Sequence, residues 1–206
     1  MRLPKSAHTS RAWRIHELTG DFELEDVWLL PTPGGPDDLG RLVQHFTSRD
    51  KGGREFPAAL SALFALRWKL GQLFGWDKPD SGVGERVTSL RARLPADLLE
   101  APRGPDIHAV PGRNCVDGQP IFSSVYHTHN EWAAEISNRT VHAVLHVGWV
   151  PDASGSGYHA QMAVLVKPNG LLGRVYMAAI KPFRYAVVYP LLLRSMGRRW
   201  QMQAVR

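Results

Sequence analysis

Five histidines are concentrated in the second half of the chain, in segments whose residue pattern is typical of neighbouring strands. They are His127, His129, His142, His146 and His159. Imidazole nitrogens are common ligands of transition metals, and Glu131 or Glu135 would supply a carboxylate beside them. The residue types therefore allow a metal site, provided that the fold gathers them on one surface.

The strand pattern places three of these histidines away from the core. His142, His146 and His159 alternate with apolar residues, so they fall on the opposite face of the sheet. Their spacing also departs from the two-histidine and glutamate pattern of cupins. We therefore expect a half-solvated polar face, with no bound metal and no cofactor.

Candidate nucleophiles are weakly supported. Ser123 and Ser124 lie near His127 and Glu131, but they lack the strand-to-helix elbow that the Gly-x-Ser-x-Gly motif provides. Cys115 would need a defined neighbour to lower the pKa of its thiol. The sequence therefore predicts no catalytic residue.

A further set of residues has the chemistry to bind an apolar molecule. Large rings with polar tips and a flexible thioether suit a ligand that needs one or two hydrogen bonds. The candidates are Trp132, Trp149, Met162, Tyr176, Phe183 and Tyr185. Each alone is more typical of core packing, and only a common architecture would make them the wall of a pocket.

The composition is that of an ordinary globular protein. Of 206 residues, 44% are hydrophobic and 21% charged, which predicts one sizeable core and a single domain over residues 1–206. Lys and Arg exceed Asp and Glu by 25 to 19, a net charge of +6. Because the basic residues are scattered and do not alternate with aromatic residues, we expect no nucleic acid partner and only weak contact with anionic surfaces.

The expected cellular compartment is inferred from three features that the sequence lacks: a second cysteine, a secretory leader and a membrane-spanning segment. Cys115 is the only cysteine, so no intrachain disulfide can form and a reducing cytoplasm is expected. Residues 1–14 lack the continuous apolar run of a secretory leader. The most apolar window, residues 186–193, is too short to cross a bilayer. We therefore expect a cytoplasmic protein without a membrane span.

The elements that must position these side chains are visible as residue patterns. Residues 22–30 indicate a first strand, followed by two helices, one beginning at Asp37 or Asp38 and one over 57–76. A Gly- and Pro-rich stretch at 77–120 is hard to assign and is expected to hold one or two short strands. Four strands in a meander then follow, over residues 121–137 with a break at 128–130, over 140–150 and over 158–166.

A long apolar and basic helix is predicted over residues 171–200. Pro182 and Pro190 interrupt its pattern, so kinks or segment boundaries are expected at both. Arg184 is expected on a solvated basic face. The apolar stripe of the helix is Tyr176, Ile180, Phe183, Val187 and Leu191. A curved sheet covered by such a helix would leave a cavity between the two.

Several short motifs carry a resemblance that covers most of the chain. They are Asp26-Val27-Trp28, Trp68-Lys69-Leu70-Gly71, Ser137-Asn138-Arg139-Thr140-Val141-His142, Lys167-Pro168-Asn169-Gly170 with Tyr176, and Lys181-Pro182-Phe183. Together they resemble an uncharacterised bacterial family of unknown function. Its members also occur as the domain after the dinucleotide-binding half of atypical short-chain-dehydrogenase-like proteins.

The order of the elements also resembles the START/SRPBCC-like helix-grip superfamily, which includes lipid carriers, birch-pollen-allergen-like proteins and polyketide aromatases. The resemblance implies an α+β helix-grip fold, in which an antiparallel curved sheet wraps round a long kinked C-terminal helix and two shorter helices follow the first strand. It implies no catalytic residues. The chain has no Gly-rich dinucleotide fingerprint, so no nicotinamide cofactor is expected.

Three functions follow as hypotheses. The first is binding of a small apolar or lipid-like molecule between sheet and C-terminal helix. The second is an enzyme of the same fold with aromatase- or cyclase-like acid–base chemistry. The third is a regulatory, partner-binding domain for a dehydrogenase-like protein. Fold alone does not choose among them.

Overall fold

The computed structural model describes residues 1–47, 87–108, 120–138, 140–153, 155 and 157–204. The strands in these residues are β1 (Glu23–Leu29), β2 (Ile107–His108), β3 (Pro120–His127), β4 (Glu131–Ser137), β5 (Val141–Pro151) and β6 (Tyr158–Pro168). The helical segments are α1 (Ser6–Thr9), α2 (Ile15–Leu18), α3 (Leu39–Thr47), η2 (Leu90–Arg93), α5 (Ala96–Glu100), α6 (Gly170–Phe183), η3 (Arg184–Val188) and α7 (Tyr189–Ala204). The protein is therefore of the mixed α+β class.

The six strands form one curved antiparallel sheet, with the order β1-β6-β5-β4-β3-β2. The predicted meander is confirmed from β3 to β6, and the predicted break at 128–130 is the β3–β4 turn. β2 confirms a short strand within 77–120. The predicted helix at 57–76 lies outside the described residues.

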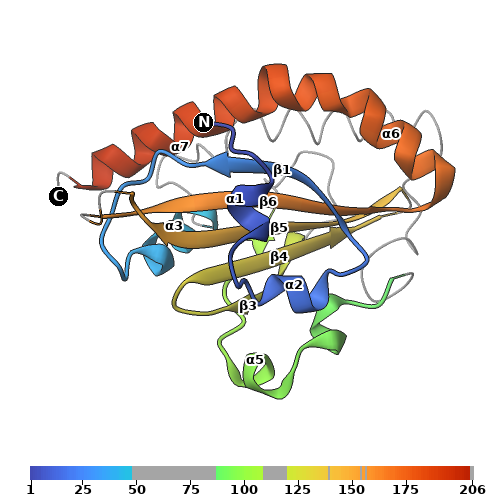
Figure 1. The fold of residues 1–206 in the computed structure, drawn as a ribbon, viewed down its shortest axis with the longest axis horizontal. Coiled ribbons are helices and arrows are strands. Elements are labelled where there is room, and N and C mark those ends of the chain that lie inside the picture. Colours follow the sequence, from blue (N-terminus) through green and yellow to red (C-terminus); the bar gives the residue numbers. More distant parts are fainter. Residues whose placement is uncertain (48–86, 109–119, 139, 154, 156, 205–206) are drawn as a thin grey trace.

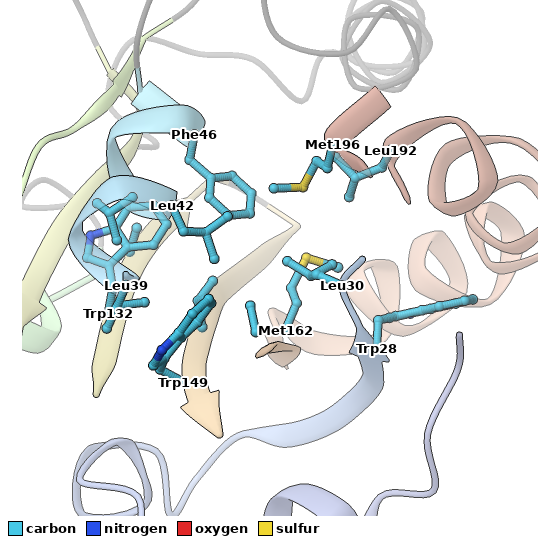
Figure 2. Packing of buried hydrophobic residues seen from close by; sticks show 14 of the residues in the cluster. Trp28, Leu30, Leu39, Leu42, Phe46, Trp132, Trp149, Met162, Leu192 and Met196 are labelled. Atoms are coloured by element: carbon cyan, nitrogen blue, oxygen red, sulfur yellow. The ribbon is translucent and has the colours of Figure 1, made fainter. Parts of the chain in front are cut away.

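The alternation of the strands gives the sheet two apolar faces. On the inner face, strand residues pack against α3 and the C-terminal helix (Figure 2). This cluster includes Trp28, Leu30, Trp132, Trp149 and Met162, with Leu39, Leu42 and Phe46 from α3 and Leu192 and Met196 from α7. On the outer face, Trp13, Ile15 and Leu18 of the N-terminal segment pack against Tyr126, Val144 and Leu165. The sheet is therefore a middle layer between two cores.

The C-terminal helix runs as a continuous arc along the sheet (Figure 1). Pro182 lies inside α6, and the five residues of η3, between Pro182 and Pro190, form a π-helical turn. The two prolines therefore bound a change of helix type within one helical run. No helix within the described residues combines the length and the apolarity that a bilayer span requires.

The π-turn shifts the buried stripe of the helix by one residue. Tyr176 and Ile180 are buried as predicted, but the buried stripe then continues through Val188 at the end of the turn and Leu192 beyond it, and Leu191 is 43% exposed. The predicted continuation at 187 and 191 is wrong, because a π-turn holds one residue more than an α-turn. A prediction that assumes the same number of residues in every helical turn cannot reveal that extra residue.

The histidines lie on the outer face, as predicted, but the expected half-solvated environment is wrong for two of them. His142 and His146 are 1% and 0% exposed. The N-terminal segment and η2 cover them. Residues 1–18 carry too short an apolar pattern to predict that cover, which is decided by packing of α1 and α2 on the sheet.

Candidate functional site

A cavity of about 150 Å³ lies between the inner face of the sheet and the C-terminal helix. Its walls come from four strands, from α3 and from α6, η3 and α7. The lining residues are Phe46, Phe122, Ile136, Asn138, Val141, Ala143, Val144, Leu145, Met162, Val164, Val166, Tyr176, Met177, Ile180, Arg184, Val188, Tyr189 and Leu192. An apolar cavity of this size accommodates a molecule about as large as benzene.

The sheet floor beneath the helix is incompletely covered. Ala143, Leu145 and Val164 are partly exposed although they lie on the middle strands β5 and β6. Apolar side chains in the middle of a covered sheet are normally closed off by the opposite layer. Here Ala143 and Val164 pack against the cluster that holds Tyr176 and Ile180 of α6, and Leu145 packs against the inner core, but all three also line the cavity.

Close contacts on both sides of the cavity hold the helix to the sheet. At Gly173 of α6, a Cβ atom would lie 2.1 Å from the carbonyl oxygen of Thr140, so only glycine permits this approach. At the other side, Arg184 of η3 pairs with Asp26 of β1. The segment between Gly173 and Arg184 bridges the floor between these two attachments.

The attachment at Arg184 is a buried polar cluster. The guanidinium contacts the Asp26 carboxylate, donates to the Tyr189 hydroxyl at 2.9 Å and lies 3.8 Å from the Glu25 carboxylate. Tyr185 and Tyr189 each donate a hydrogen bond to Asp26. Asp26 and Arg184 are 1% and 5% exposed, so the pair is removed from water.

The protonation states of this cluster follow from its contacts. Burial, together with the hydrogen bond to Asp26, raises the pKa of Tyr185 to about 12, and burial also raises the pKa of Tyr189. Burial alone would lower the pKa of Arg184, but Tyr189 and Asp26 outweigh it and hold that pKa above its ordinary value. Both phenols are therefore neutral and the guanidinium is charged near neutral pH.

A β-bulge places Asp26 on the inner face. Leu24 pairs with Leu165 and Asp26 pairs with Val164, so Glu25 is an extra residue in β1. An extra residue reverses the alternation, which turns Leu24 outward and Asp26 toward the helix. The local irregularity thus provides the partner of Arg184.

The structure brings two of the six predicted site residues to the cavity, Met162 and Tyr176. Trp132 and Trp149 belong to the inner core, where their indole N–H groups donate to Ser124 Oγ at 2.9 Å and to the Gly35 carbonyl at 2.8 Å. Phe183 and Tyr185 are not among the lining residues. Tyr185 lies within the π-turn, where its hydroxyl donates to Asp26.

Sequence reasoning missed Asp26 and Arg184. Arg184 was expected on a solvated face, yet it follows Ile180 by four residues and continues the buried stripe. The sequence offered two signals for a buried ion pair. One is an isolated carboxylate in a strand, and the other is an isolated cation on the apolar side of a helix. Neither reveals its partner, since 158 residues separate the two.

A second polar cluster lies on the outer face, where three imidazoles form a hydrogen-bonded file. His16 Nε2 lies 3.2 Å from His8 Nδ1, and His8 Nε2 lies 3.1 Å from His146 Nδ1. His146 Nε2 lies 3.1 Å from the Glu131 carboxylate, which also accepts from the Tyr126 hydroxyl. Because an ionised carboxylate only accepts, Nε2 carries the proton in all three rings.

Within the file, His8 and His146 are neutral. Burial, with the nearby His146 and His16, lowers the pKa of His8 to about 3, and burial lowers that of His146. Burial alone would raise the pKa of Glu131, but the hydrogen bond from His146 contributes to holding it below its ordinary value. None of these side chains lines the cavity.

Two further outer-face histidines also pair with carboxylates, His159 with Asp152 and His142 with Glu135. His142 Nε2 lies 2.8 Å from Glu135, whose carboxylate also accepts from Ser89 and from the N–H of Leu90. These bonds attach η2 to the sheet. Among the described residues, no three His, Cys, Asp or Glu side chains are grouped as a metal ion would require. The outer cluster therefore joins the covering segments to β4 and β5.

Comparison with protein families identifies the group to which this arrangement belongs. A model of the family described as "Protein of unknown function (DUF2867)" matches residues 18–191. The chain is a member of the DUF2867 family. The DUF2867 match contains all six strands, α6 and η3, and therefore both Asp26 and Arg184. Comparisons with curated proteins and with solved structures gave no match.

Proposed function

We propose that this DUF2867 protein binds a small apolar or lipid-like molecule in the cavity between the sheet and the C-terminal helix. One observation carries the proposal: apolar residues in the middle of the sheet and on the facing helix line one cavity, and Ala143, Leu145 and Val164 on its floor stay partly exposed. Leaving such surface uncovered forfeits hydrophobic stabilisation of about 25 cal/mol per Å². A ligand with apolar groups recovers that stabilisation.

The arrangement of sheet and helix supports assignment to the helix-grip type as part of the same proposal. The curved antiparallel sheet lies on one side of the cavity and the long C-terminal helix on the other. α6 supplies one wall with Tyr176, Met177 and Ile180, and β5 and β6 supply the other. Binding between sheet and helix is the use for which this geometry is suited.

The enzyme alternative finds less support at the cavity. Acid–base catalysis needs a group that gains and loses a proton near the working pH. Tyr189 lines the cavity, but its hydroxyl is bonded to Asp26 and Arg184 and its pKa is raised. These contacts favour a binding protein over an aromatase-like enzyme.

The test is to recover the ligand and to block the cavity. Protein purified under native conditions is analysed by native mass spectrometry, and its organic extract by small-molecule mass spectrometry. Val164→Phe fills the cavity floor, whereas Val175→Phe makes the same change at a position of α6 that is 60% exposed. We expect an apolar molecule with the wild type and with Val175→Phe, and none with Val164→Phe.

Equal recovery from both variants would contradict the proposal. Melting temperatures of the two variants serve as the control for folding. A protein that carries no small molecule and co-purifies with a dehydrogenase-like enzyme would favour the regulatory-domain alternative instead.

A further inference from the structure

The polar groups at the cavity identify the chemical class of its ligand. We infer that the cavity selects compact neutral molecules and rejects carboxylates and cations of the same shape. This inference rests on the proposed binding function and extends it from apolar ligands in general to uncharged ones. Four observations on the lining residues carry it.

The first observation concerns charge at the wall. Among the described residues that line the cavity, Arg184 is the one with an ionised side chain. An arginine in an apolar pocket is ordinarily a receptor for a carboxylate, because its planar donors match two oxygens. Whether it acts so here depends on what its donors already bind.

The second observation is that these donors already bind groups of the protein. One terminal nitrogen of Arg184 contacts the buried Asp26 carboxylate and the Tyr189 hydroxyl, and the other faces Glu25 at 3.8 Å. Asp26 therefore balances the guanidinium charge, Glu25 lies nearby, and the Arg2 guanidinium stacks on the neighbouring Tyr185 ring at 4.7 Å. A ligand carboxylate would have to compete with Asp26 for the donors of Arg184.

The third observation concerns the neutral polar groups. The side-chain oxygen of Asn138 accepts three hydrogen bonds, from Thr140 N, Thr140 Oγ1 and Val141 N at 2.8, 2.6 and 3.1 Å. The Tyr189 hydroxyl donates to Asp26 at 2.7 Å and accepts from Arg184. These groups organise the wall of the cavity and are committed to partners within the protein.

The fourth observation is that the described lining residues offer no carboxylate to a cation. Asp26 and Glu25 lie near the cavity but face Arg184, and neither is among the lining residues. A ligand ammonium or amidinium would meet the guanidinium first and would lose its water without gaining a carboxylate. Burial of an unpaired ion is strongly unfavourable, so a neutral ligand is preferred over either charged one.

The experiment compares three probes of nearly the same shape at pH 7: nitrobenzene, which is neutral, benzoate, which is an anion, and benzamidinium, which is a cation. Binding is followed by NMR of protein labelled with methyl-¹³C methionine. Met162 and Met177 line the cavity, whereas Met1 and Met202 are 69% and 66% exposed and act as internal controls. The full chain is used throughout.

We expect nitrobenzene to shift the Met162 and Met177 signals saturably and to leave Met1 and Met202 unchanged. Benzoate and benzamidinium should bind at least about tenfold more weakly. Binding of benzoate or benzamidinium as tight as that of nitrobenzene would overturn the charge selection while leaving the proposed binding function intact. If no probe moves Met162 and Met177, both the proposed function and this inference fail.

Asp26→Asn tests the origin of the selection. It removes the nearest countercharge of Arg184 and should raise the affinity for benzoate relative to nitrobenzene about tenfold or more. An unchanged ratio would show that Arg184 does not face the ligand and would overturn the charge argument. Glu25→Gln, at a side chain that is 19% exposed, provides a milder variant of the same kind if Asp26→Asn does not fold.

Discussion

At the scale of single residues, the pair of Asp26 and Arg184 joins β1 to the C-terminal helix. Both side chains are buried, and two tyrosine hydroxyls complete the hydrogen bonds of the carboxylate. A buried ion pair adds little over well-packed apolar residues, but removal of one partner leaves an uncompensated charge. Replacing either residue alone is therefore expected to lower the free energy of unfolding.

Arg184→Met should lower the free energy of unfolding by about 3–5 kcal/mol, because it leaves the Asp26 carboxylate buried without a cation. The double variant Asp26→Leu with Arg184→Met should recover part of that loss. Urea denaturation of the three proteins measures the effect. A loss below about 1 kcal/mol in Arg184→Met would mean that water or Arg2 compensates the carboxylate.

The histidine file makes stability depend on pH. The pKa of His8 is about 3 in the folded protein, against about 6.5 when unfolded. The unfolded state therefore binds the proton at higher pH, and stability falls as pH decreases below 6.5 toward 3. The slope reaches about 1.4 kcal/mol per pH unit for each such histidine. His146, whose pKa burial also lowers, adds to the loss in the same direction.

His8→Gln should flatten part of this decline. The informative window is pH 6.5 to 4.5, because the carboxylates with lowered pKa, such as Glu131, begin to lose their contribution only below the ordinary glutamate value of 4.5. His129→Gln, at an exposed position, is the matched control and should keep the wild-type slope. Chemical denaturation at several pH values makes the comparison, and equal slopes in His8→Gln and the wild type would contradict it.

At the scale of elements, the C-terminal helix is shaped by one close approach and one irregular turn. Gly173 lets the start of α6 touch Thr140, the residue before β5, and the π-turn of η3 sets the phase of α7 so that Leu192 is buried. A regular α-helix would present Leu191 in place of Leu192. The phase of α7, and with it the wall of the cavity, is therefore set between Pro182 and Pro190.

Two Gly→Ala changes separate close approach from helix propensity. Gly173→Ala should destabilise the protein by about 1–3 kcal/mol, because its Cβ would lie 2.1 Å from a backbone carbonyl that cannot rotate away. Gly40→Ala in α3 has no atom within 4 Å of the added Cβ and should stabilise by about 0.4–1 kcal/mol. Thermal or urea unfolding checks both signs, and destabilisation of the same size in both would refute the distinction.

At the scale of the whole molecule, the sheet separates a side that carries the cavity from a side covered by the N-terminal segment. The inner face carries the cavity, and the outer face carries the N-terminal segment with its histidine file. Trp13 fits against Gly148 of β5, where an added Cβ would lie 2.6 Å from the indole ring. Each face has its own cover, so stability and binding can be altered separately.

Trp13→Ala should cost about 3–5 kcal/mol, the usual effect of removing a buried indole. At a temperature where this variant is still folded, nitrobenzene should shift Met162 and Met177 as in the wild type. Val164→Phe should show the converse, with binding lost and Trp13 still packed. Loss of probe binding in folded Trp13→Ala would show that the two faces are coupled.

Much of the fold follows from local patterns that the sequence carries openly. Alternation over β5 and β6 predicts which side of each strand is apolar, and turn residues predict where the meander reverses. The burial of Leu39, Leu42, Val43 and Phe46 in α3 follows from helical spacing. Periodicity predicts the buried residues of these elements because each element buries one side and contains few bulges or changes of helix type.

The sequence by itself determined the α+β class, the antiparallel meander, the closing helix and the two faces of the sheet, since these depend on residues a few positions apart. Only the tertiary structure decided which inner residues face a cavity, that β1 bulges at Glu25 and that the helix shifts phase at η3. It also decided that Asp26 meets Arg184 and that His8 meets His146. These features join segments more than a hundred residues apart or insert a single residue into a regular pattern, and periodicity contains neither kind of information.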